Sequence, residues 1–146
     1  MSPGAVQAQM DNIQEFFAAF EQFTASGDAS GHDRFFASPF MSASADGVRV
    51  LTPEQLAAVA PRMRAMLDKH GRRSVALVGV QERQLDANYV LAIADWQWHF
   101  EPEGAAAFDV TLASTHILHK SADGLRIVFY RSGDVVQELR SRGLIS

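Results

Sequence analysis

Two long stretches of alternating side chains constrain the fold of this chain more than any other feature of its sequence. Residues 89–100 and 108–120 alternate with a period of two, which is typical of strands that bury one face. A short loop with a proline and a glycine joins them, so we expect an antiparallel pair. With His99 opposite Asp109, the register also pairs Gln97 with Thr111 on a mixed face, and Trp98 with Val110 and Trp96 with Leu112 on an apolar face.

The far end of the apolar face carries polar side chains, the one hint of a site in the sequence. In the predicted register these are Ser114 and His116. A tight turn centred on Asp123 and Gly124 then predicts a hairpin with a last strand over 125–131. The hairpin places Leu118 opposite Phe129 and His116 opposite Arg131.

The predicted neighbourhood of His116 and Arg131 suits an anionic or carbonyl ligand. A guanidinium offers a planar fork to a carboxylate, and an imidazole titrates near neutral pH. The alternative is that Arg131, at the end of its strand, lies in solvent or pairs with an acid. We expect His116 to be the best catalytic candidate. The expected ligand-binding residues are Phe20, Phe36, Met63, Trp96, Trp98, Ser114, His116, Phe129 and Arg131.

Length and composition exclude several classes of protein. At 146 residues the chain is expected to form a single domain over 1–146 with a full hydrophobic core. It has no cysteine, which excludes thiol catalysis, disulfides and cysteine-ligated zinc. A net charge of −4 with scattered basic residues argues against nucleic acid as a partner. Without a signal-like start or a long apolar run, we expect no membrane span and a cytoplasmic location.

The first part of the chain reads as two helices and a hairpin. Between residues 7 and 24, phenylalanines and other apolar residues recur every three or four positions, which predicts a helix with a wide apolar stripe. A second short helix is expected over 29–36, ending before Pro39. Short strands over 39–44 and 48–51 follow, joined at a turn that contains Asp46 and Gly47.

The second part begins with the strongest local signal. Thr52, Pro53 and Gln55 form a capping sequence that opens a third helix, which Gly71 ends. Pro61 lies inside that helix and is expected to kink or split it. Strands over 74–84, 89–100, 108–120 and 125–131 follow. Asp134, with Gln137 three residues later, predicts the cap of a short last helix.

Helices that precede a run of consecutive antiparallel strands imply an α+β fold, with the helices packed on one face of a strongly curved sheet. This order resembles the nuclear transport factor 2-like (NTF2-like) superfamily, in particular its SnoaL-like and related small bacterial branch. The resemblance covers almost the whole chain and rests on local strings rather than on a catalytic signature. These are the Phe-rich first helix ending in Ser26-Gly27-Asp28, the Asp46-Gly47 turn leading to Leu51-Thr52-Pro53-Glu54, and Asp123-Gly124 before Arg126-Ile127-Val128.

The resemblance implies a conical domain with a pocket at its mouth and, usually, a homodimer formed through the outer sheet face. Members include steroid isomerases, polyketide cyclases, dehydratases and epoxide hydrolases, so the fold does not select an activity. The tyrosine and paired aspartates of the steroid isomerases have no counterpart here. Many members carry a His or Trp in the last hairpin, where this chain has Leu125, Phe129, Tyr130 and Arg131.

The remaining polar candidates favour structural roles. Asp95 is a second candidate for a general base, since burial would raise its pKa, but it shares the mixed face with Gln97 and His99, which we take as the outer face. His99 with Asp109 is interpreted as a cross-strand pair, and His119 as interface or surface. The histidines at 32, 70, 99, 116 and 119 lie on different elements or faces, so neither a metal nor another cofactor is expected.

Two functions follow as alternatives. The first is a small-molecule-binding domain with a mainly apolar pocket for a small hydrophobic or acidic ligand. Such a pocket could support proton transfer, as in an isomerase, cyclase or dehydratase, with His116 as acid or base and Arg131 stabilising an oxyanion. The second is a non-catalytic dimeric scaffold that works through its outer face. Leu91, Ile93 and Ile117 on that face favour a homodimer.

Overall fold

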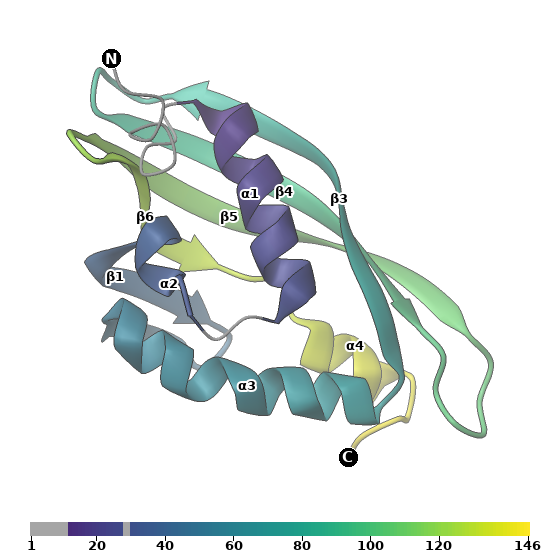
Figure 1. Ribbon diagram of the computed structural model, residues 1–146. Coiled ribbons are helices and arrows are strands. Elements are labelled where there is room, and N and C mark those ends of the chain that lie inside the picture. Colours follow the sequence, from purple (N-terminus) through teal and green to yellow (C-terminus); the bar gives the residue numbers. More distant parts are fainter. Residues whose placement is uncertain (1–11, 28–29) are drawn as a thin grey trace.

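The computed structural model describes residues 12–27 and 30–146. Helices and strands follow the predicted order (Figure 1). They are α1 (Ile13–Ser26), α2 (His32–Phe35), β1 (Phe36–Ser44), β2 (Gly47–Leu51), α3 (Pro53–Lys69), β3 (Arg72–Gln84), β4 (Tyr89–Phe100), β5 (Phe108–Ser121), β6 (Gly124–Arg131) and α4 (Val135–Ser141). The predicted helix residues before Asn12, and Ala29 at the start of the second predicted helix, lie outside the described residues.

One six-stranded curved sheet, in the order β2-β1-β6-β5-β4-β3, forms the framework. All neighbouring strands are antiparallel except β1 and β6, which are parallel. The helices lie on its inner face, and α1 crosses the long strands β3 to β5 (Figure 1). The α+β prediction is therefore confirmed. No helix in the described part of the chain is long and apolar enough to cross a membrane.

The predicted register of β4 and β5 is confirmed throughout. His99 pairs with Asp109 and Trp96 with Leu112. Alternate residues of β4 from Val90 to Trp96 are buried on the inner face. The period-two pattern thus identified both the pairing and the buried face.

Helix ends form where capping chemistry predicts. The Thr52 side chain accepts from the Gln55 backbone N–H while the Gln55 side chain accepts from the Thr52 N–H, a complete capping box. Asp134 caps α4 through the backbone N–H of Gln137. The sequence predicts that Pro61 kinks or splits α3; the helix runs unbroken from Pro53 to Lys69, so Pro61 does not split it. Pro61 itself is exposed, so the proline costs α3 one backbone hydrogen bond without displacing core side chains.

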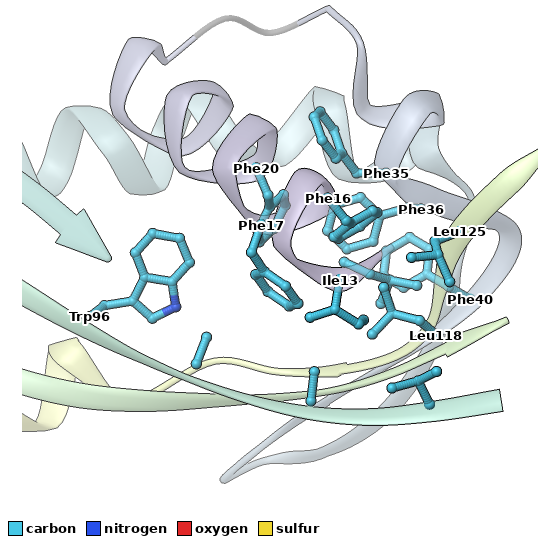
Figure 2. Close-up of a cluster of buried hydrophobic side chains, with 14 of the residues drawn as sticks. Ile13, Phe16, Phe17, Phe20, Phe35, Phe36, Phe40, Trp96, Leu118 and Leu125 are labelled. Carbon is cyan, nitrogen blue, oxygen red and sulfur yellow. The ribbon is translucent and has the colours of Figure 1, made fainter. Parts of the chain in front are cut away.

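Phenylalanines of α1 fill the space between that helix and the sheet. Figure 2 shows Phe16, Phe17 and Phe20 pointing from α1 into one cluster with Trp96 of β4 and residues of α2 and β1. Phe16 and Phe17 have almost no exposed surface, and such aromatic burial is a main source of stability here. A second cluster joins α4 to the sheet through Leu139 and Phe100.

The last hairpin departs from its predicted register. Ser121 pairs with Gly124, so the turn residues are Ala122 and Asp123, one position earlier than predicted. The Ser121 hydroxyl closes this turn, because it accepts from the Asp123 N–H at 3.1 Å and donates to the Gly124 carbonyl at 2.9 Å. Gly124 has a φ of 98°, which favours glycine.

A further register shift in β6 moves two expected site residues to the other face. Between Ile117 and Leu118 of β5 the pairing shifts, so that Ile117 lies opposite Phe129 and Leu118 opposite Ile127. Predicting Leu118 opposite Phe129 and His116 opposite Arg131 was therefore wrong. Tyr130 lies opposite His116, while Arg131 lies opposite Thr115 and is exposed. Phe129 and Arg131 thus belong to the outer face, because directly opposed residues share a face.

Candidate functional site

A cavity of about 520 Å³ lies between α1, α3 and the inner face of the sheet, with contributions from β1, β4 and β6. Its volume falls within the range of about 300–1,000 Å³ that is typical of small-molecule sites. The walls are mainly apolar. The main apolar lining residues are Phe20, Phe23, Phe36, Leu56, Val59, Met63, Leu67 and Trp98.

The side of the cavity formed by α3 is open to solvent. Val59 and Met63 line it, yet 53% and 48% of their surfaces are exposed. The capping box fixes where α3 begins, and the chain enters β3 directly after Gly71, so both ends of the helix are held. Val59 and Met63 of α3 thus lie beside the core without being covered by it.

Four of the expected ligand-binding residues line this cavity: Phe20, Phe36, Met63 and Trp98. Trp96, Ser114 and His116 are buried behind its wall, and the exposed fraction of His116 is 0%. Its ring contacts Phe20 and Tyr130, with centroids 6.0 Å and 5.3 Å away, and both of these line the cavity. Phe129 and Arg131 lie on the outer face, as the register shows.

A chain of hydrogen bonds satisfies the polar groups buried behind this wall. Trp96 Nε1 donates to Ser114 Oγ at 2.8 Å, which leaves the Ser114 hydroxyl to donate to His116 Nε2 at 3.3 Å. His116 Nδ1 then donates to the carbonyl of Ala92 at 3.2 Å. This arrangement requires a neutral imidazole. Burial lowers the pKa of His116 to about 4, opposed by its hydrogen bond with Ala92, so the ring is uncharged at neutral pH.

Tyr130 is the titratable side chain that the register shift brings to the cavity in place of Arg131. Its ring lies edge-on to Phe36 at 5.6 Å. Burial raises the pKa of Tyr130, which its hydrogen bond with Ser132 partly offsets, so the phenol stays protonated well above neutral pH. The sequence does not reveal this position, because a register shift leaves no mark on a period-two pattern.

Three arginines also line the cavity: Arg62, Arg64 and Arg72. Arg64 donates from Nη1 to the Thr24 carbonyl at 2.9 Å and from Nη2 to the Ala25 carbonyl at 2.6 Å, so α3 is tied to the end of α1. Burial lowers the pKa of Arg64, and the nearby charge of Arg72 adds to this effect. A sequence signal did exist, since Arg64 interrupts the apolar stripe of α3 between Ala60 and Leu67.

The other polar candidates lie on the outer face or at the rim of the sheet. Asp95 pairs with Ala113, and the His119 ring lies 4.9 Å from Tyr89. His99 lies between two carboxylates, with Nδ1 at 2.6 Å from Asp109 and Nε2 at 2.9 Å from Glu101. Within residues 12–27 and 30–146, His, Asp and Glu side chains form no group of three that could hold a metal ion.

Comparison with known proteins agrees with this architecture. The family model described as NTF2-like protein (DUF6841) matches residues 9–134. A search of curated proteins gave no match. The SnoaL-like branch stays a prediction.

Several solved structures share the fold at low sequence identity. Aln2 from a Streptomyces species aligns with a TM-score of 0.67 and 17% identity over 97% of this chain and 99% of Aln2. The Kfla4162 protein from Kribbella flavida has a TM-score of 0.67 and 13% identity over 83% of this chain and 86% of its own. An NTF2-like superfamily protein from Salmonella enterica has a TM-score of 0.63 and 14% identity, over 83% and 87%. At such identities the similarity concerns the fold alone.

Proposed function

Since this chain belongs to the NTF2-like protein family whose model spans residues 9–134, we propose that it is a small-molecule-binding protein whose ligand occupies the cavity between α1, α3 and the sheet. The observation that carries the proposal is a cavity of about 520 Å³ with apolar walls and an open side. Partly exposed apolar side chains such as Val59 and Met63 gain burial when a ligand covers them.

Proton-transfer chemistry is the finer part of this proposal. Isomerisation, cyclisation or dehydration needs an acid or base within reach of the ligand. His116 is fully buried behind the wall with both ring nitrogens hydrogen-bonded, whereas Tyr130 lines the cavity. Any such reaction is therefore assigned to Tyr130 as a neutral donor to a carbonyl or oxyanion, in place of His116.

A second candidate is a dimeric scaffold that works through the outer sheet face. Leu91 and Ile117 are directly paired there, and Ile93 lies two residues along the same strand. The shift in β6 adds Phe129 to this face, opposite Ile117. A half-buried apolar row of this kind supports pairing with a second copy, which is compatible with ligand binding on the opposite side of the sheet.

Binding of N-phenyl-1-naphthylamine, an uncharged dye that fluoresces in apolar surroundings, tests the first proposal. We expect saturable binding to the protein and its loss in Val59→Trp, because the indole fills the cavity from a position that tolerates size. Val48→Trp, 60% exposed on β2 and outside the cavity lining, is the matched control and should bind normally. Absence of binding to the unaltered protein, or equal binding to both variants, would reject the cavity as the site and favour the scaffold.

A further inference from the structure

We propose that the ligand of this cavity is an apolar molecule with a single acid group, and that Arg64 and Arg72 bind that group. The inference rests on the proposed function, because it specifies the ligand of the same site. It comes from the distribution of charge around the cavity and from the donors that the two guanidinium groups keep unused.

The charge of the cavity is opposite to that of the chain. The whole chain has 17 acidic and 13 Lys or Arg residues and a net charge of −4. Among the described residues that line the cavity, however, three are arginines and none is Asp or Glu. A basic, largely apolar hollow in an acidic protein favours anions over neutral or cationic molecules of the same size.

Arg64 is held in place by groups that use only part of its hydrogen-bonding capacity. A guanidinium has five N–H donors, and two nitrogens of Arg64 donate to the carbonyls of Thr24 and Ala25. The contact is tight, because a Cβ built on Gly27 would lie 2.2 Å from Arg64 Nε. These carbonyls fix the guanidinium at the cavity wall without neutralising its charge, so its remaining donors are preorganised for an acid.

Arg72 is similarly fixed and only partly used. Its Nε and Nη2 reach the same oxygen of Asp68, at 2.8 Å and 2.7 Å, and its side chain is 10% exposed. Asp68 therefore accepts from one edge of the Arg72 guanidinium, and the N–H donors on its other edge remain for a ligand. The positive charge of Arg72 acts on Arg64, so an anion bound near both relieves their repulsion.

The surroundings define the rest of the ligand. Leu67 and Trp98 line the same cavity as the two arginines, and Phe20 lines it from α1. The net positive charge at Arg64 and Arg72 is small, because Asp68 forms an ion pair with Arg72. An aromatic or aliphatic carboxylate or sulfonate fits both features, with the acid at the arginines and the apolar body along these walls.

Two dyes that differ by one acid group test this inference. 8-Anilino-1-naphthalenesulfonate is N-phenyl-1-naphthylamine with a sulfonate added. We expect the sulfonate to bind more tightly than the neutral dye, and its affinity to fall with added salt while that of the neutral dye does not. Arg64→Met and Arg72→Met should each weaken sulfonate binding by about tenfold or more, since a charge-assisted hydrogen bond is lost, and change neutral binding by less than about twofold.

Arg49→Met, which removes a charge on β2 outside the cavity lining, is the control and should leave both affinities unchanged. Circular dichroism checks that each variant is folded. If Arg64→Met is unfolded, the affinity of Arg72→Met for the sulfonate and the salt dependence of binding test the inference instead. Equal binding of both dyes, or sulfonate binding unaffected by the arginine variants, overturns the inference and leaves the proposed function standing. Failure of both dyes to bind the unaltered protein overturns the proposed function itself.

Discussion

His116 and Tyr130 are direct cross-strand partners whose ring centroids lie 5.3 Å apart, and only Tyr130 reaches the cavity. Tyr130 forms part of the cavity wall, and His116 lies in the layer of side chains behind that wall. His116 has no exposed surface and takes part in a hydrogen-bond chain, so its contribution is to stability. Tyr130 is the member of the pair that lines the cavity.

The buried neutral state of His116 makes the protein sensitive to acid. Its pKa is lowered to about 4 in the fold, against 6.5 for an unperturbed histidine, so the unfolded chain takes up the proton first. Its stability contribution is complete above pH 6.5 and is lost as the pH falls toward 4, by up to about 3 kcal/mol. Urea unfolding at pH 7 and pH 4.5 should show a smaller loss for His116→Gln than for the unaltered chain. Equal losses would show that this imidazole does not titrate on unfolding.

His99 should behave in the opposite way. Both ring nitrogens face carboxylates, and hydrogen bonds to Glu101 and then Asp109 raise its pKa. Its stabilising contribution is therefore complete below pH 6.5 and disappears as the pH rises through the raised value. NMR titration of the ring should give a pKa above that of a model histidine, reduced in Asp109→Asn and in high salt, because the site is exposed. A normal pKa in the unaltered protein would contradict the geometry.

The strand pairs and caps could be predicted because their signals are local. Alternation along β4 and β5 fixes which residues face the core, and a one-residue slip would have exposed Trp96. Thr52 and Gln55 form a cap through residues three apart. The features that the sequence did not predict depend on contacts between distant segments or on single-residue shifts in strand pairing. Nothing in the sequence near Val128 marks the shift in β6, and the approach of Arg64 to the end of α1 depends on how two helices pack.

Gly27 should be more sensitive to substitution than Gly143, a glycine with a similar positive φ. Its φ is 71°, close to the 76° of Gly143, so Ala introduces similar backbone strain of about 1 kcal/mol at both positions. At Gly27 the new methyl group also meets the Arg64 guanidinium, whereas no atom lies within 4 Å of the position at Gly143. Chemical unfolding should therefore show a larger loss for Gly27→Ala than for Gly143→Ala. Equal losses would mean that Arg64 moves away at no cost.

The outer sheet face should form a homodimer. Leu91, Ile93, Ile117 and Phe129 provide an apolar row there, and burying it against a second copy removes it from water. We expect light scattering to give twice the chain mass of 16.0 kDa at micromolar concentrations, and Ile93→Asp to give a folded monomer. Val48→Asp, at a position 60% exposed on β2, is the matched control and should remain dimeric. A monomer in the unaltered protein would show that there is no such interface and would remove the scaffold alternative. A dimer that persists in Ile93→Asp would place the interface elsewhere and would also remove the scaffold alternative based on this face.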